Sequence, residues 1–189
     1  TFLSQSVPQI RANQVHSAGV TGSGVKVCIV DTGVDDTHPA LNPLVAEHDF
    51  VNNDPDATDD HGHGTHVAGI VASTDATYKG VAYGSSLMAA KVLSASGSGF
   101  SSDVINGIEW CVTNGARIIS MSLGGGAFTN TCDSDPLAQA SNNAVNNGVV
   151  VFAASGNDGF LNAIATPACG SKVIAVGAVD KNDGRTAFS

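Results

Sequence analysis

Five continuous apolar runs recur along the 189-residue sequence, and they constrain its fold more than any other feature. The runs are 25–33, 86–93, 116–125, 148–157 and 172–179. Each has the length and the β-branched content of a strand that is buried on both faces. Because helices cover both faces of such strands, the runs predict a parallel sheet at the centre of the molecule.

Helical patterns lie between the predicted strands. Residues 103–114 carry an apolar stripe at helical spacing, and Asp103 is the predicted N-cap. A second helix is predicted over 136–147, because Asp135 precedes Pro136 at a first-turn position and Gly148 follows the end. A third, buried helix is predicted over 65–73. Strands that alternate with helices indicate an α/β fold, a three-layer arrangement with a mostly parallel sheet and helices on both faces.

Length and charge narrow the class of protein further. A chain of 189 residues suits one domain with a sizeable core, so we expect a single domain over 1–189. The formal net charge is −9 with only 8 Lys and Arg, which argues against nucleic acid as a partner. No apolar run approaches the length of a membrane span, so no membrane partner is expected.

Polar residues follow three of the predicted strands. Asp31 ends the first, Ser122 follows a middle strand, and Asn157 follows a later one. In open parallel sheets, sites form beyond the carboxyl ends of the strands. A buried carboxylate at Asp31 is costly unless it is paired. It is either a turn cap or the partner that orients a histidine base.

Three of the six histidines, His61, His63 and His66, stand together in HGHGTHVAGI at a predicted helix start. They are metal ligands, a catalytic base with neighbours, or incidental polar residues. Their i, i+2, i+5 spacing differs from the i, i+4 spacing that places two zinc ligands on one helical face. The spacing therefore disfavours zinc, whereas a histidine oriented by a carboxylate suits a general base.

Four motifs, in this order, resemble those of the subtilisin-like serine proteases (subtilases): VDTGVDDTHP, HGHGTHVAGI, SMSLGG and ASGNDG. The resemblance covers nearly the whole chain. It implies that His63 is the general base, Asp31 its orienting carboxylate and Asn157 the donor that stabilises the oxyanion. His66 matches a histidine of the same motif that is not catalytic, and His61 lies just outside the motif.

The resemblance also implies two segments that bind the backbone of a protein or peptide substrate. Glycine suits these segments because the substrate backbone comes close to them. One segment is an extended edge that pairs with the substrate. The residues of that edge are Ser122, Leu123, Gly124 and Gly125, and those of the opposite segment are Gly97, Ser98 and Gly99.

The family's nucleophilic serine lies in a G-T-S-M-A-x-P motif that these 189 residues do not contain. By the family's usual spacing, RTAFS precedes that serine by about thirty residues. A nicked protease with a bound C-terminal fragment, an incomplete fragment, and a truncated, inactive peptide-binding homologue are the alternatives. Loss of the last helices would uncover core surface, which favours the first two. The expectation is a secreted serine endopeptidase whose 1–189 portion alone is inactive, with a propeptide as partner during maturation.

The stretch HDFVNNDPDATDD resembles a calcium-binding loop of the family. Asp49, Asp54 and Asp56 fall on or near its ligand positions, and Thr58 offers a further oxygen. The alternative is a solvated acidic loop. A different calcium site of the family is expected to be absent, because Ala40 stands in place of a ligand aspartate.

None of the four cysteines forms a CxxC pair, so a zinc ribbon or thioredoxin-type site is unsupported. Cys28 and Cys111 each lie in an apolar pattern and are expected to be buried thiols. Cys132 and Cys169 lie in loops that flank the same end of the sheet in the subtilase layout. The resemblance therefore implies a disulfide between them and an oxidising compartment. The alternative is four free thiols in a reducing compartment.

Overall fold

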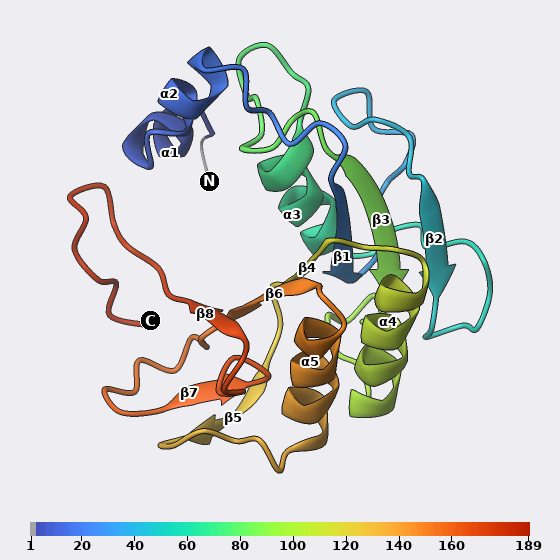
Figure 1. Cartoon of the computed structure of the whole chain (residues 1–189), viewed down its shortest axis with the longest axis vertical. Helices are drawn as coiled ribbons and strands as arrows, with labels where there is room; N and C mark the ends of the chain where they lie inside the picture. The colour runs from blue at the N-terminus through green and yellow to red at the C-terminus, as the bar shows by residue number, and fades with distance from the viewer. Residues whose placement is uncertain (1–2) are drawn as a thin grey trace.

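Six parallel strands form one sheet in residues 3–189, the part of the chain that the computed structural model describes (Figure 1). Their order across the sheet is β2-β3-β1-β4-β6-β8. The strands are β1 (Lys26–Asp31), β2 (Ala46–Asp49), β3 (Ser86–Lys91), β4 (Ile118–Met121), β6 (Val150–Ala154) and β8 (Ile174–Val176). The predicted α/β fold with a parallel sheet is confirmed.

Helices cover both faces of this sheet (Figure 1). The helices are α1 (Leu3–Gln9), α2 (Ala12–Ser17), α3 (His63–Ala72), α4 (Ser101–Thr113) and α5 (Pro136–Asn146). Alternate side chains of β1 point to opposite faces: Val27 and Ile29 pack in the cluster that includes α3, and Cys28 and Val30 in the cluster that includes α4 and α5. No helix within residues 3–189 has the length and apolarity needed to cross a membrane.

Strand β1 occupies the centre of the sheet and determines where a site can form. It pairs with β3 on one side and with β4 on the other, both in parallel. After β1, the chain forms β2 and β3 on one side of it, and then β4, β6 and β8 on the other side. The direction in which strands are added therefore reverses between β1 and β4. At such a reversal, the connections leave the carboxyl ends of the strands in opposite directions and open a crevice. Asp31, the last residue of β1, stands at this crevice.

The starts of α5 and α4 are capped in different ways. Asp135 caps α5, because its Oδ1 accepts hydrogen bonds from Leu137 N at 3.0 Å and Ala138 N at 3.2 Å. The prediction that Asp103 caps α4 is wrong. The helix begins earlier, with the Phe100 carbonyl accepting from Asp103 N at 3.0 Å. Asp103 lies in the first turn instead, where its charge still favours a helix N-terminus.

The run 172–179 departs from the prediction of a strand buried on both faces. Only Ile174–Val176 forms β8, and all three of its residues are exposed. The strand pairs with β6 at the end of the sheet order, and no element of residues 3–189 pairs with its outer edge. A separate antiparallel pair, β5 (Gly125–Phe128) with β7 (Ile164–Thr166), lies beside this end of the sheet.

The cysteines form two disulfides. Cys132 is joined to Cys169, the pair that the resemblance implies, with Cα atoms 5.4 Å apart. The expectation of free thiols at Cys28 and Cys111 is wrong, because these residues are joined as well, with Cα atoms 6.0 Å apart. Both are fully buried as expected. They face each other because α4 packs on the β1 face that carries Cys28, and this contact is not visible in either local pattern.

Thiol counting tests this pairing. We expect no reactive thiol in the denatured, unreduced protein and four after reduction, because both pairs are oxidised. In the chain-entropy model, each bridge stabilises the fold by roughly 4 kcal/mol. Two reactive thiols before reduction would show that one bridge is absent, and peptide mapping would identify which.

Candidate active site

The site is built on a contact between the end of β1 and the start of α3. His63 Nδ1 lies 2.7 Å from Asp31 Oδ1. Since a carboxylate only accepts, Nδ1 carries the proton and donates it, which leaves Nε2 as the basic nitrogen. The Asp31 side chain is fully buried, whereas that of His63 is 42% exposed. A buried carboxylate thus orients a ring whose other edge meets solvent.

Close backbone packing makes this contact possible. A Cβ added at Gly64 would lie 2.1 Å from the Gly33 carbonyl oxygen and 3.2 Å from Asp31 Cβ. Any side chain at position 64 would therefore push the first turn of α3 away from β1. The glycine that follows His63 in the motif is required by this approach of two backbone segments.

Asp59 holds the first turn of α3 from the other side. Its carboxylate accepts hydrogen bonds from the Thr65 hydroxyl at 2.6 Å, from Thr65 N at 2.9 Å and from the backbone N–H groups of His61 and Gly62. Burial acts to raise the pKa of Asp59, but these hydrogen bonds outweigh it and lower the pKa to about 2. Asp59 is therefore ionised at neutral pH and fixes the backbone on both sides of His63.

A cleft of about 700 Å³ passes over His63. Its lining brings together every residue that the sequence assigned to substrate binding, together with Asn157. Those lining residues are Gly97, Ser98, Gly99, Ser122, Leu123, Gly124 and Gly125. Segments far apart in the sequence thus meet around one groove at the carboxyl ends of the strands, as an α/β site requires.

The predicted substrate-binding edge is partly free and partly paired. Ser122, Leu123 and Gly124 lie between β4 and β5, outside both strands. Gly125 belongs to β5 and is paired with Thr166 of β7. A Cβ at Gly124 would lie 2.9 Å from the Thr166 carbonyl oxygen, so glycine is needed where this edge crosses β7.

Asn157 sits in a turn whose starting residue, Ser155, is held by two backbone hydrogen bonds. Ser155 N donates to the Val176 carbonyl at 3.0 Å, and Ala165 N donates to the Ser155 carbonyl at 2.8 Å. Gly156 has a φ of +115°, which favours glycine. The turn therefore presents Asn157 to the cleft from a rigid base, which is what a preorganised donor needs.

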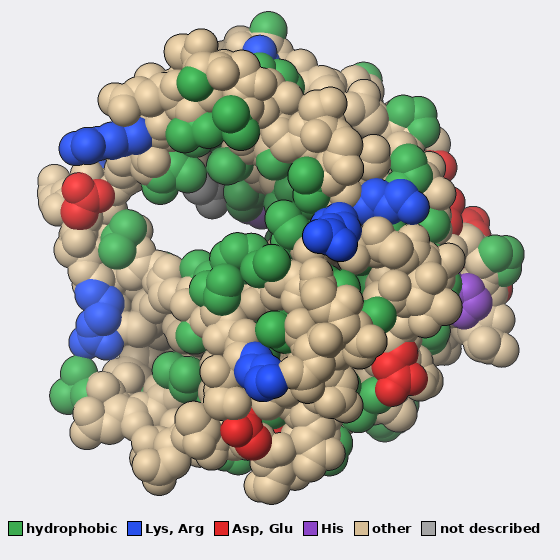
Figure 2. Space-filling view, in the orientation of Figure 1, with side chains coloured by type: hydrophobic (Ala, Val, Ile, Leu, Met, Phe, Trp, Pro, Cys, Tyr) green, Lys and Arg blue, Asp and Glu red, His purple; other side chains and the backbone are tan. Residues whose placement is uncertain are grey.

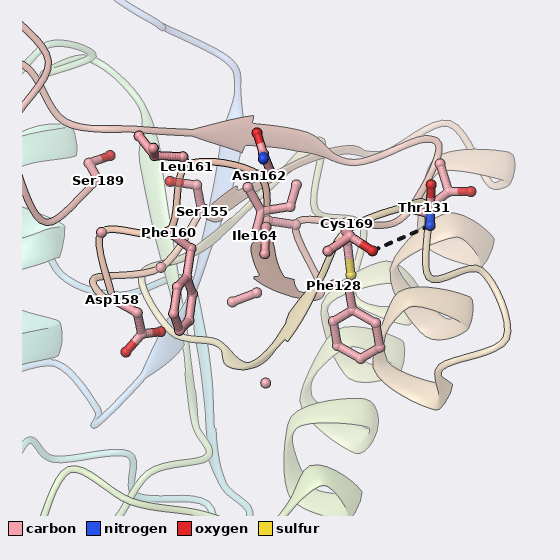
Figure 3. Close-up of a pocket in the computed structure, with 18 of the residues that line it drawn as sticks. Phe128, Thr131, Ser155, Asp158, Phe160, Leu161, Asn162, Ile164, Cys169 and Ser189 are labelled. Carbon is pink, nitrogen blue, oxygen red and sulfur yellow. Dashed lines mark hydrogen bonds between the residues drawn. The ribbon is translucent and has the colours of Figure 1, made fainter.

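A second hollow of about 520 Å³ lies behind this turn (Figure 3). Phe128, Phe160, Ile164 and Cys169 contribute to its lining, and Asp158 lies at its edge toward the cleft. The Cys132–Cys169 disulfide thus forms part of the wall of this second hollow.

The acidic loop does not bring its predicted calcium ligands together. Asp49 is 2% exposed, and both of its carboxylate oxygens accept hydrogen bonds from the next turn of its own loop. Asp54 accepts from Asp56 N, and Asp56 accepts from Thr58 N and Oγ1. Within residues 3–189, no three His, Cys, Asp or Glu side chains are grouped as a metal site. In this arrangement the residues do not fit a calcium ion.

Two buried polar residues near the site were not predicted from the sequence. Thr32 is 1% exposed and Lys91 is 1% exposed. The Lys91 ammonium contacts the Thr32 carbonyl at 2.6 Å and Asp60 Oδ1 at 2.5 Å. A lysine inside an apolar run could have indicated a buried polar site, because a fully buried lysine needs hydrogen-bond or charge partners close by.

Comparison with known proteins agrees with this geometry. The sequence profile of the Subtilase family matches residues 22–189. The chain belongs to the subtilase family. Subtilisin DY of Bacillus licheniformis is 46% identical over 188 residues, which make up 97% of this chain and 66% of that protein. The resemblance read from the four motifs is thereby confirmed.

Other relatives extend the comparison. An alkaline protease of Alkalihalobacillus alcalophilus is 44% identical over 195 residues, covering 100% of this chain and 49% of the relative. The crystal structure of a cold adapted subtilisin-like serine proteinase aligns with a TM-score of 0.79 at 37% identity, covering 89% of this chain and 60% of that one. The chain therefore spans about half the length of the alkaline protease it matches.

The Asp59 clamp predicts a specific pH dependence of stability. The pKa of Asp59 is about 2 in the folded chain and about 3.9 in an unfolded one. Its contribution is therefore fully present above the unfolded pKa and is lost as the pH falls through the folded pKa. We expect the stability difference between wild type and Asp59→Asn to shrink as the pH falls from about 4 to about 2. Denaturant titrations of both proteins across this range measure it, and parallel curves would contradict the clamp.

Proposed function

We propose that residues 1–189 are the first part of the catalytic domain of a secreted serine endopeptidase. Its nucleophilic serine is supplied by a segment outside these residues, later in the same polypeptide or in a separate chain. The observation that carries the proposal is the 2.7 Å contact between His63 and Asp31, beside a cleft that Asn157 also lines. The substrates are proteins and peptides.

Each residue has a defined part in the reaction. Asp31 keeps the Nδ1 proton on the His63 ring, so that Nε2 faces the serine hydroxyl and takes its proton as the serine attacks the peptide carbonyl. The protonated His63 then donates that proton to the leaving amine. Asn157 donates a hydrogen bond to the oxyanion that develops on the carbonyl oxygen. The substrate backbone lies in the cleft between Ser122–Gly125 and Gly97–Gly99.

The exposed apolar surface supports a further segment packed against this part of the fold. Ile174, Val176 and Val179 are 45%, 49% and 58% exposed, and they lie on β8 and just after it. Figure 2 shows an opening through the molecule with hydrophobic side chains along its rim. Apolar side chains grouped in this way indicate a surface that another polypeptide segment covers.

Two further parts of the proposal concern the setting of the enzyme. The two disulfides support an extracellular location, because disulfides persist in oxidising compartments. The second part is that a propeptide binds the chain during maturation. This part is supported only by membership of the subtilase family.

An activity assay tests the proposal directly. We expect residues 1–189 alone not to cleave peptides, and cleavage to return when a C-terminal segment with a G-T-S-M-A-x-P serine motif is added. A serine-directed phosphonate should abolish the restored activity. Phosphonate-sensitive cleavage by 1–189 alone, free of contaminants, would contradict the division of the triad.

Variants of the serine-containing protein test the residue roles. His63→Ala or Asp31→Ala should lower kcat by about four orders of magnitude, because triad members act as a unit. His61→Ala is the matched control, since its ring also lines the cleft, whereas His63 is the histidine that contacts Asp31. Steady-state kinetics with a peptide substrate measure all three. If His61 proves as essential as His63, the assignment of the base is wrong.

The proposal includes a structural calcium ion at the loop of Asp49, Asp54, Asp56 and Thr58. It is supported by the likeness of the loop to a calcium loop of the family, by the exposed Asp56 and by the partly exposed Asp54. Binding requires the loop to rearrange, because Asp54 Oδ1 and Asp56 Oδ1 now accept hydrogen bonds from within the loop.

Chelation tests the calcium proposal. Removing calcium should lower the thermal midpoint, since an ion that binds only the folded state adds about 2.7 kcal/mol at a hundredfold excess over Kd. The double variant Asp54→Ala, Asp56→Ala should lose most of this dependence. Identical melting curves with and without chelator would rule out a structural calcium ion in this chain.

A further inference from the structure

Every hydrogen-bonding atom of Thr32 is engaged at the active site. Its backbone N donates to Asp31 Oδ1 at 2.7 Å, the same oxygen that His63 Nδ1 contacts. Its carbonyl oxygen accepts from the Lys91 ammonium at 2.6 Å. Its side-chain hydroxyl makes two further bonds. A residue that is 1% exposed and fully satisfied in this way has little freedom to move.

The hydroxyl links two segments that are far apart in the sequence. It donates to Asp59 Oδ1 at 2.9 Å and accepts from Gly64 N at 2.9 Å. Gly64 directly follows His63, so this bond holds the peptide that carries the base. A buried N–H without a partner is costly, and in this structure Gly64 N is satisfied by Thr32.

Lys91 fixes the other side of the same residue. Its ammonium donates to Asp60 Oδ1 at 2.5 Å and to the Leu93 carbonyl at 3.2 Å, in addition to the Thr32 carbonyl. All three donors of the ammonium are therefore used. The Thr32 backbone is held by β3, while its hydroxyl reaches α3.

We propose that Thr32 is a positioning residue for the His63–Asp31 pair. Its hydroxyl ties the first turn of α3 to the end of β1, and its backbone N–H holds the Asp31 oxygen that His63 contacts. A second tie, from Asp35 N to Thr65 Oγ1 at 2.9 Å, lies farther along the helix and does not involve the peptide next to His63. The inference rests on the proposed function only for the catalytic role of His63.

Wild type and three variants at position 32 separate the effect of the hydroxyl group from the effect of side-chain shape. Thr32→Val removes the hydroxyl and keeps the branched shape, whereas Thr32→Ser keeps the hydroxyl and removes the methyl group. Thr32→Ala removes both. Wild type against valine, and serine against alanine, are two matched pairs that differ in the hydroxyl. The second pair decides the question if the valine variant does not fold.

The readout is the Nδ1 proton of His63, followed by NMR in the chain labelled with ¹⁵N-histidine. A proton held between the ring and Asp31 resonates downfield and exchanges slowly with water, and His63→Ala identifies its signal. We expect the valine and alanine variants to exchange this proton about tenfold faster, or to lose the signal, because Gly64 N is left unsatisfied. The serine variant should match wild type.

Amide spectra of the sheet show separately whether each variant is folded. A folded valine or alanine variant that keeps the wild-type signal and exchange rate would overturn the proposal. A serine variant that loses the signal as fully as alanine would also overturn it. No cleavage is measured, so this result is independent of whether the protein proves to be a peptidase.

Discussion

The approach of the first turn of α3 to the end of β1 is the contact on which the site depends. Gly64 leaves no room for a side chain between these backbones, because a Cβ there would lie 2.1 Å from the Gly33 carbonyl oxygen. Because the two segments lie so close, a buried carboxylate on the strand reaches the histidine ring at hydrogen-bond distance. Asp59 and Thr32 then hold the helix in place with bonds to its backbone. The electrostatics of the pair follow from this packing.

Much of this arrangement was predictable because the relevant signals are local. Each of the five apolar runs contains an observed strand. The predicted burial on both faces holds for β1 and β3, whereas β4 and β6 alternate buried residues with partly exposed or exposed ones. The motifs located Asp31, His63 and Asn157 because family motifs tie those residues to fixed neighbours. The cleft then followed from the rule for parallel sheets, without knowledge of any side-chain contact.

The features that were missed depend on which elements pack together. Cys28 and Cys111 are buried as predicted, but their pairing requires α4 to lie on the matching face of β1. The run at 172–179 has core composition, yet Val176 is exposed because β8 ends the sheet in the described residues. The composition of a segment indicates which structures it can form, and the packing of the elements around it determines which one forms.

The central position of β1 also has a consequence for how the chain folds. Lys26 pairs with Ser86, and Val27 pairs with Ile118. The first strand of the chain therefore pairs with strands that lie much later in the sequence. Loop-closure entropy must be spent before these pairings stabilise the chain, and proteins dominated by such distant contacts fold slowly. Gln9 of α1 bonds to Asp180 and Asp183 near the other end, which adds one more long closure. A contact that held β1 beside β3 and β4 early would therefore speed folding.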